Sequence, residues 1–229
     1  MPRENRKVII DTDPGVDDAL AIMFALSYGL PVEALTTVFG NASIDDVTAN
    51  AGEILAIMKS ALPVYPGASR PLRVEPLLAK SHGTGGFGGY RSSVSRAAQP
   101  RTAVDFLEDT LENEASGTVD VVLLGPATNL ALLAARRPDL MAKVASVTAL
   151  GGVLGRGNVT PYAEFNALND PHALAAVLAL PCPVTLIPHR RLPQGDIHHR
   201  RPFQDSRFRH RRTYPGNRRG IHPLLYQAP

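Results

Sequence analysis

The sequence predicts an α/β fold in which an open, mostly parallel sheet is flanked by helices. Short β-branched runs alternate with longer helical patterns up to residue 188. The runs are mostly apolar throughout, as in strands that are buried on both faces of a parallel sheet. Hydrophobic residues make up 44% of the 229 residues and charged residues 20%, so the chain has the composition of an ordinary globular domain with a packed core.

Six strands and five helices are expected in alternation. The first strand, at 7–10, is followed by a helix over 19–28 that stops before Gly29 and Pro31. The later strands are expected at 32–39, 63–65, 119–124, 144–150 and 184–187, and the later helices at 44–60, 101–114, 129–136 and 171–180. The long segment 66–100 is expected to be a loop. Its glycine-rich run, 82–89, is either a flexible surface loop or a mobile segment over a site.

Four aspartates lie within eight residues at the end of the first predicted strand: Asp11, Asp13, Asp17 and Asp18. Asp17 and Asp18 are expected in the first turn of the next helix, where a negative charge is stabilising. That role does not account for Asp11 and Asp13, because like charges at the end of a buried strand repel unless a cation or protons intervene. Ligands bind at the carboxyl ends of parallel strands, and oxygen ligands suit a hard divalent cation. The cluster therefore predicts a metal site.

The acidic segment 11–18, Asp-Thr-Asp-Pro-Gly-Val-Asp-Asp, resembles the N-terminal signature of the inosine–uridine-preferring nucleoside hydrolases. The resemblance continues in the correct order through the motifs at 36–41, 124–130, 151–152, 157–158, 163–166 and 170–171. It covers residues 7–188. It implies a nucleoside hydrolase-like fold with a Rossmann-like core, and calcium-dependent hydrolysis of the N-glycosidic bond of ribonucleosides to ribose and free base for salvage.

The resemblance also implies a role for each residue of the metal site. Asp13 would be both a calcium ligand and the catalytic base that takes a proton from the attacking water. Asp18 would bind calcium, and the backbone carbonyl of Thr128 would be a further ligand. Asp11 would be a supporting carboxylate that orients the cluster.

The substrate would be held by polar side chains that follow the strands. By resemblance, Asp17, Asn41 and Asn166 would hydrogen-bond the ribose, and Asn158 and Glu164 would hold its 5′-hydroxyl. On composition alone, Asn41 is also consistent with a turn residue. Glu164 and Asn166 are two apart in the sequence and are also consistent with ordinary surface polar residues.

Two further positions complete the predicted substrate site. Leu150 would line the pocket near the sugar. His82, which stands beside the glycine-rich run, is either a substrate contact or a plain loop histidine. The nucleobase preference is left open.

The basic segment 189–229 differs in character from everything before it. It holds ten arginines and two aspartates, so its formal charge is +8, and it has no periodic apolar face. The sequence predicts a domain over 1–188 and a disordered tail over 189–229. An altered reading frame, an appendage that binds nucleic acid or an acidic partner and an inert tail are the three explanations. The altered reading frame is preferred, and the binding appendage is the least favoured of the three.

The family's later carboxylate and histidine cannot be placed in this chain. Calcium should then bind more weakly, and we expect a truncated, aggregation-prone protein with little or no activity. One alternative is an inactive remnant that still binds calcium or ribose. A remote alternative is a haloacid-dehalogenase-like phosphohydrolase, which has an Asp-x-Asp motif like Asp11–Asp13 but gives the Asp17–Asp18 pair no role.

The remaining expectations concern the protein's setting. The chain shows no apolar signal peptide or membrane span, and its single cysteine, Cys182, suits a reducing cytosol. Cys182 is expected to be a small buried residue rather than a nucleophile. We expect a cytoplasmic protein with a small-molecule ribonucleoside substrate and no membrane partner. A dimer or tetramer is implied by the resemblance.

Overall fold

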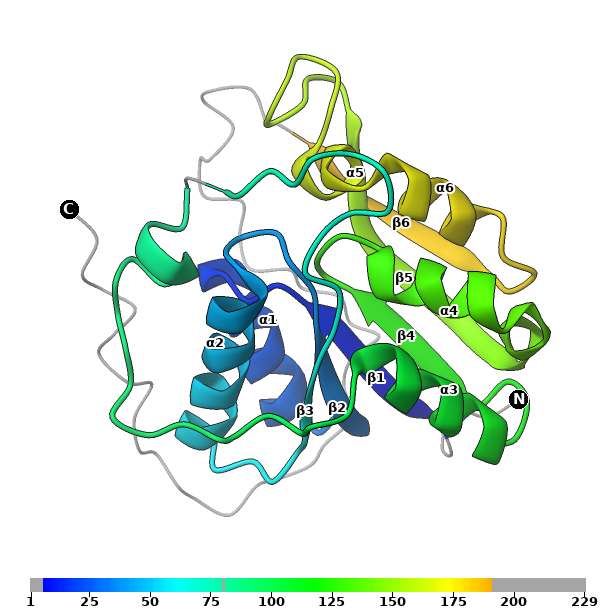
Figure 1. Ribbon diagram of the computed structural model, residues 1–229, viewed down its shortest axis with the longest axis horizontal. Coiled ribbons are helices and arrows are strands. Elements are labelled where there is room, and N and C mark those ends of the chain that lie inside the picture. The colour runs from blue at the N-terminus through cyan, green and yellow to red at the C-terminus, as the bar shows by residue number, and fades with distance from the viewer. Residues whose placement is uncertain (1–5, 80, 191–229) are drawn as a thin grey trace, which may run out of the picture. The chain divides into compact units, whose positions relative to one another are not determined.

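The computed structural model describes residues 6–79 and 81–190, which contain one six-stranded sheet (Figure 1). The strand order is β3-β2-β1-β4-β5-β6, and every neighbouring pair is parallel. The strands are β1 (Lys7–Thr12), β2 (Val32–Thr37), β3 (Val64–Pro66), β4 (Val119–Leu123), β5 (Val144–Leu154) and β6 (Val184–Arg190). The predicted mostly parallel sheet is confirmed.

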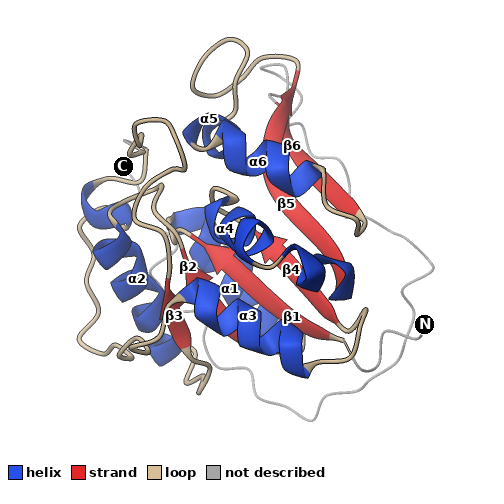
Figure 2. Ribbon diagram, turned by 45° about the vertical axis from the view of Figure 1, so that its right-hand side comes forward, coloured by secondary structure: helices blue, strands red, loops and turns tan. Residues whose placement is uncertain are grey.

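Helices cover both faces of the sheet (Figure 2). On one face, α1 (Val16–Ser27) and α2 (Ile44–Ile57) pack over β1, β2 and β3. On the other, α3 (Ala103–Asn113), α4 (Thr128–Arg136) and α6 (Pro171–Leu178) pack over β1, β4 and β5. Successive residues of β1 point to opposite faces of the sheet: Ile9 is buried beneath α3, α4 and α6, and Ile10 is buried beneath α1 and α2.

The strand order places a topological switch point between β1 and β4. From β1 the chain winds outward to β2 and β3, crosses back to β4, and then winds the other way to β5 and β6. The connections after β1 and β4 therefore leave the sheet in opposite directions, and a crevice opens at the carboxyl ends of these two strands. The acidic segment 11–18 lies there.

The structure contains every predicted strand and helix, with differences at their ends. Helix α1 begins at Val16 rather than at residue 19, because the Asp18 side chain accepts a hydrogen bond from the backbone N–H of Gly15 (3.1 Å) and caps the helix. Three short helices were not predicted: a 3₁₀ helix over Thr84–Gly86, another over Pro138–Lys143, and α5 (Phe165–Asn169). Each spans only one or two turns and has too few residues for an apolar periodicity.

The last described strand passes the predicted end of the domain. β6 continues to Arg190, so His189 and Arg190 belong to the sheet. The rest of the predicted basic tail lies outside the described residues. Within the described ranges, no helix is long and apolar enough to cross a membrane.

Candidate functional site

The acidic segment folds so that three of its four carboxylates are buried. β1 ends at Thr12, and the chain turns through Pro14 and Gly15 into α1. Asp11 and Asp13 are each 1% exposed and Asp18 is 6% exposed, whereas the Asp17 side chain is 70% exposed. Burying three carboxylates within one short segment is costly unless the charges are compensated.

Asp13 lies in a slot between two glycines. Its Oδ2 accepts a hydrogen bond from the backbone N–H of Asn41 at 2.8 Å. Its Oδ1 is buried and has no hydrogen-bond partner among the described residues. A Cβ atom on Gly40 would lie 2.0 Å from Oδ2, and one on Gly125 would lie 2.7 Å from Oδ1. Only glycine therefore leaves room for this carboxylate at both positions.

Asp11 lies deeper in the sheet and is partly satisfied. Its Oδ1 accepts hydrogen bonds from the Thr36 hydroxyl and from Nδ2 of Asn129 (2.7 Å). Its Oδ2 is buried and unpartnered within the described part of the chain. Burial raises the pKa of the Asp11 carboxyl to about 7, although these two hydrogen bonds act in the opposite direction.

Asp18 and Asn41 tie the cluster together. The Asp18 carboxylate accepts hydrogen bonds from the Thr12 hydroxyl (2.9 Å) and from Nδ2 of Asn41 (3.1 Å). The same Asn41 amide also donates to the backbone carbonyl of Asp13 at 2.9 Å. Burial raises the pKa of both carboxyls. The charge of Asp18 raises that of Asp13 further, and the charge of Asp17 that of Asp18.

The donor atoms of this cluster suit a hard divalent cation. Two buried carboxylate oxygens, Asp11 Oδ2 and Asp13 Oδ1, accept no hydrogen bond from the described residues, and a proton or a cation would compensate their charge. Across residues 6–79 and 81–190, however, no group of three or more histidine, cysteine or acidic side chains is arranged to hold a metal ion. The two carboxylates predicted as metal ligands, Asp13 and Asp18, would therefore need further ligands from other atoms, such as the carbonyl predicted for Thr128.

Thr128 is held in place by a residue that the sequence analysis did not select. Thr128 is 1% exposed and begins α4, and its hydroxyl donates to Oδ2 of Asp170 at 2.8 Å. The same Oδ2 accepts the backbone N–H of Leu72 at 2.9 Å, and Oδ1 accepts that of Ala173 at 3.0 Å. Asp170 thereby connects the start of α4, the loop that contains Leu72 and the start of α6.

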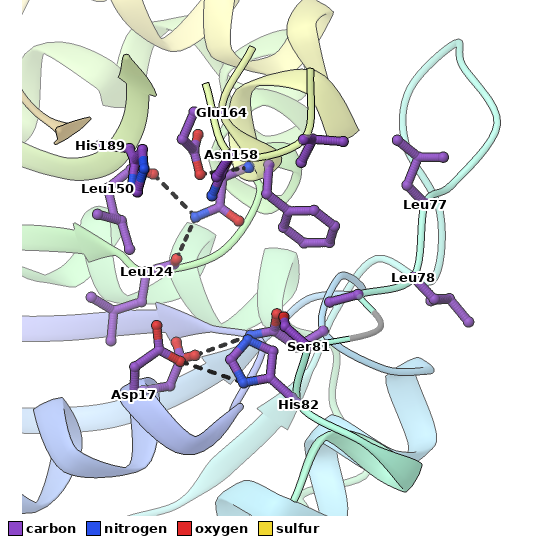
Figure 3. Close-up of a pocket in the computed structure, with 16 residues that line it drawn as sticks. Asp17, Leu77, Leu78, Ser81, His82, Leu124, Leu150, Asn158, Glu164 and His189 are labelled. Atoms are coloured by element: carbon purple, nitrogen blue, oxygen red, sulfur yellow. Dashed lines mark hydrogen bonds and ion pairs between the residues drawn. The ribbon is translucent and has the colours of Figure 1, made fainter. Parts of the chain in front are cut away.

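A pocket of about 660 Å³ opens above the acidic segment (Figure 3). All seven side chains predicted to bind substrate line it: Asp17, Asn41, His82, Leu150, Asn158, Glu164 and Asn166. Asp18 also lines the pocket. Asp11, Asp13 and Thr128 are not among its lining residues and are buried.

Two sides of the pocket carry different groups. On one side His82 lies beside Asp17, with Nδ1 of the imidazole 3.8 Å from the Asp17 carboxylate and 3.4 Å from the backbone N of Val16 (Figure 3). On the other side lie Asn158, Glu164 and His189. His189, the penultimate residue of β6, had been assigned to the basic tail, and its position at the pocket was not predicted.

Glu164 and Asn166 are buried, at 4% and 8% exposure, and they are not surface residues. Glu164 caps α5 by accepting the backbone N–H groups of Asn166 (2.9 Å) and Ala167 (3.0 Å), and it also accepts that of Gly152 (3.2 Å). The Asn166 amide donates to the carbonyls of Leu124 (2.7 Å) and Leu150 (3.2 Å). These two side chains join the ends of β4 and β5 and form part of the pocket lining.

Sequence reasoning missed the buried amides that brace the site. Asn129 donates to Asp11 and to the Thr37 carbonyl (2.9 Å), and its own Oδ1 accepts the N–H of Ala68 (2.8 Å). Asn169 pairs with both the N–H and the carbonyl of Leu77, each at 2.8 Å. For Asn129 the available signal was an asparagine in a predicted helix at a position where the pattern calls for an apolar residue, and Asn169 gave no such signal because α5 was not predicted.

The fold and the site define a doubly wound α/β protein with a buried carboxylate cluster next to a pocket, lined by polar and apolar side chains, at the switch point. The sequence model of the inosine-uridine preferring nucleoside hydrolases matches residues 8–218. The chain belongs to this family. The match continues past Pro188 into the basic segment.

The chain is similar to two curated bacterial proteins. It is 41% identical over 175 residues to the non-specific ribonucleoside hydrolase RihC of Klebsiella pneumoniae, covering 74% of this chain and 57% of that protein. It is 40% identical over 195 residues to the pyrimidine-specific ribonucleoside hydrolase RihA of Salmonella paratyphi A, covering 83% and 62%. The chain thus spans about 60% of the length of these relatives.

Solved structures give the same result for the fold. A plant nucleoside hydrolase matches with a TM-score of 0.74 and 35% identity, over 80% of this chain and 60% of the other. An inosine-guanosine nucleoside hydrolase matches with a TM-score of 0.75 and 34% identity, over 81% and 62%. The open parallel sheet with helices on both faces is therefore the nucleoside hydrolase fold.

Proposed function

We propose that the chain carries the cation- and ribose-binding part of a calcium-dependent ribonucleoside hydrolase. The observation that carries the proposal is the Asp13 carboxylate, which is 1% exposed and has an unpartnered Oδ1 among the described residues, beside Asp18. Asp18 and the predicted ribose-binding side chains line the pocket above it. Family membership supports this reading over a phosphohydrolase, since it also gives Asp17 and Asp18 a role.

Asp13, Asp18 and the carbonyl of Thr128 would hold the cation. When bound, calcium would gather the ribose diol and a water at one point and lower the pKa of that water. Calcium accepts carboxylate, carbonyl, hydroxyl and water oxygens in a flexible geometry, which suits such a mixed set of ligands.

The side chains of the chain itself would bind the sugar and move the proton. Asp13 would accept the proton of the attacking water at Oδ1, the oxygen that lacks a hydrogen-bond donor in the described structure. Asp17 is exposed at the pocket, where its carboxylate would accept a hydrogen bond from a ribose hydroxyl. Asn41 and Asn166 would fix the sugar ring, and Asn158 and Glu164 its 5′-hydroxyl. Fixing the ring favours the oxocarbenium-like transition state of glycosidic cleavage.

The nucleobase would lie on the His82 side of the pocket. Leu77, Leu78 and Phe165 also line the pocket and provide apolar surface for a planar base. The relatives' names include both a non-specific and a pyrimidine-specific hydrolase. Family membership therefore does not define which base this chain accepts.

The setting proposed for the enzyme follows the family resemblance. We propose that it works in the cytoplasm and forms a dimer or tetramer. The only cysteine, Cys182, is free, which is consistent with a reducing compartment. Light scattering of the purified chain would measure the assembly directly.

The test is the release of free base from inosine, uridine, cytidine and adenosine. The chain is assayed with calcium, with a chelator, and as the Asp13→Ala variant, for which we expect a loss of about 10²–10⁴-fold in turnover. Asp45→Ala, which removes an exposed aspartate from α2, is the matched control and should keep wild-type turnover.

Three outcomes separate the alternatives. Turnover that needs both calcium and Asp13 supports the hydrolase. Calorimetric binding of calcium or ribose without turnover identifies a binding remnant and contradicts the enzymatic proposal. Folded protein that neither binds nor turns over would reject both.

A further inference from the structure

A buried asparagine on α2 joins the acidic segment to the glycine-rich run. Asn50 is 0% exposed, and its Nδ2 donates to two backbone carbonyls, that of Pro14 at 3.0 Å and that of Gly85 at 2.8 Å. Its Oδ1 accepts a hydrogen bond from Nη1 of Arg91 at 3.0 Å. One side chain thus holds the turn before α1 and both ends of the segment 85–91.

The glycine-rich run is a compact turn and not an extended loop. The backbone N–H of Gly88 donates to the carbonyl of His82 at 2.7 Å, and that of Gly89 donates to the carbonyl of Thr84 at 3.0 Å. Gly85 has φ +64°, a conformation that favours glycine, and its Cβ would lie 2.3 Å from the Arg91 guanidinium. The run therefore packs tightly against its neighbours because it lacks side chains.

The turn is fastened along α2 by polar side chains one helical turn apart. Arg91 donates from Nη2 to the Asp46 carboxylate at 2.9 Å while its Nη1 reaches Asn50. Asp46 and Asn50 are four residues apart and therefore lie on the same face of the helix. Glu53, which is 4% exposed, accepts the backbone N–H of Ser92 at 2.9 Å.

The fastened turn begins with His82, which lines the pocket. The imidazole Nδ1 lies 3.4 Å from the backbone N of Val16, and a Cβ on Gly15 would lie 2.8 Å from the same Nδ1. His82 therefore rests directly on the turn that carries the acidic segment. Asn50 donates to the carbonyl of Pro14 in that turn and to the carbonyl of Gly85 in the glycine-rich run. The same side chain therefore holds both segments that meet at His82.

We propose that Asn50, assisted by Arg91, is a positioning residue that holds His82 over the substrate pocket. This inference rests on the proposed function, in which His82 contacts the bound nucleoside. Without the anchor, the turn would occupy other arrangements, and only the fraction that places His82 correctly would bind substrate. The expected effect is on the affinity for substrate and not on the chemical step, because Asn50 donates to none of the buried carboxylates.

The first measurement is hydrogen exchange of the turn, which needs no activity. In Asn50→Ala, the amides of Gly88 and Gly89 should exchange at least about tenfold faster than in the wild type, because the local opening becomes easier. Asn113→Ala is the matched control, since Asn113 is an exposed asparagine that donates to a backbone carbonyl at 2.9 Å. It should leave these amides unchanged.

The second measurement is the kinetics of nucleoside cleavage by the same variants. We expect KM to rise about tenfold in Asn50→Ala with kcat changed less than about threefold, because a smaller fraction of the molecules would place His82 correctly for substrate binding. Arg91→Ala should raise KM by about threefold, because Arg91 is 44% exposed and its ion pair is weaker. Arg91→Ala also serves as the test should Asn50→Ala fail to fold.

Each result bears on a different claim. Unchanged exchange in Asn50→Ala overturns the anchor. Faster exchange with wild-type KM overturns its link to substrate binding. If the wild type shows no turnover, the proposed function fails, and the anchor is then decided by the NMR resonances of the His82 imidazole. These should shift in Asn50→Ala and in Arg91→Ala but not in Asn113→Ala, and resonances that stay in place would contradict the inference.

Discussion

Two pairs of buried carboxylates lie on opposite sides of the site, and they differ in how their oxygens are satisfied. Asp11 and Asp13, at the end of β1, each keep one buried oxygen without a partner among the described residues. Glu164 and Asp170, which flank α5, have both oxygens bound to hydrogen-bond donors. All four residues are at most 4% exposed.

The difference separates carboxylates that keep an unpartnered oxygen from carboxylates whose oxygens are all used to hold neighbouring segments. A carboxylate whose oxygens all accept backbone N–H groups is stabilised in its charged form and fixes the segments that donate to it. A buried carboxylate with a free oxygen is destabilising until a proton or cation arrives. The four residues are similarly buried, and they differ in whether both carboxylate oxygens accept a hydrogen bond.

The largest expected effect is a pH-dependent loss of stability caused by Asp11. Folding raises the pKa of this carboxyl from 3.8 to about 7, so Asp11 binds its proton more tightly in the folded state. The wild type should lose stability as the pH rises from about 4 to above 7, by an amount of a few kcal/mol in metal-free protein. Asp11→Asn removes this ionisable group and should lack the part of the loss that Asp11 causes, while Asp13 and Asp18, whose pKa values burial also raises, keep theirs.

Urea unfolding in chelator at pH 4 and pH 8 measures this difference. The two proteins should be similar in stability at pH 4, and Asp11→Asn should be the more stable at pH 8. The exposed Asp45→Asn serves as the control and should track the wild type at both pH values. An Asp11→Asn variant that parallels the wild type throughout would show that the Asp11 carboxyl is compensated in the metal-free protein.

An intermediate effect is expected for Asp170→Ala. The change leaves the Thr128 hydroxyl and the backbone N–H groups of Leu72 and Ala173 without their acceptor. Removing a helix cap and leaving buried donors without an acceptor should lower the free energy of unfolding by about 2–4 kcal/mol. Denaturant unfolding measures the loss.

Asp139→Ala is the matched control for that change. Asp139 is exposed and pairs with Arg137, so its removal should change the free energy of unfolding far less than that of Asp170. Equal losses for Asp139→Ala and Asp170→Ala would mean that the hydrogen bonds of Asp170 contribute no more than a surface ion pair.

The smallest expected effect is that of Glu164→Gln. Glutamine keeps one acceptor oxygen but presents an amide nitrogen to donors that need an acceptor at the start of α5. We expect a loss of about 1 kcal/mol in unfolding free energy, together with weaker nucleoside binding. Thermal unfolding and calorimetric titration give the two values, and weaker binding with unchanged stability would contradict the stabilising role of the hydrogen bonds that Glu164 accepts.

The sequence was sufficient for the fold because the apolar runs are local signals. Each predicted strand and helix is present, and the errors concern ends and short helices, where a single capping contact such as that of Asp18 on Gly15 decides the boundary. Contact between α5 and the ends of β4 and β5 depends on tertiary structure, so the burial of Glu164 and Asn166 was not visible in the sequence.

The site could be predicted only where a motif carried it. The structure places all seven predicted substrate residues at one pocket, and their roles stay predictions. No role was predicted for Asn50, Asn129 or Asp170, although the last two stand in the motifs 124–130 and 170–171, because their partners are mostly backbone groups of segments distant in the sequence. His189 was missed because the basic composition after Pro188 concealed the end of β6.

The slot that holds Asp13 has a consequence for how this site tolerates variation. Gly40 and Gly125 contribute no functional group, yet an added methyl at either position would meet the carboxylate between them. Natural variation should therefore be as restricted at these two positions as at the aspartate itself. Mutations at Gly40 and Gly125 should therefore inactivate the site although neither residue reacts, because a side chain there would fill the space that the Asp13 carboxylate occupies.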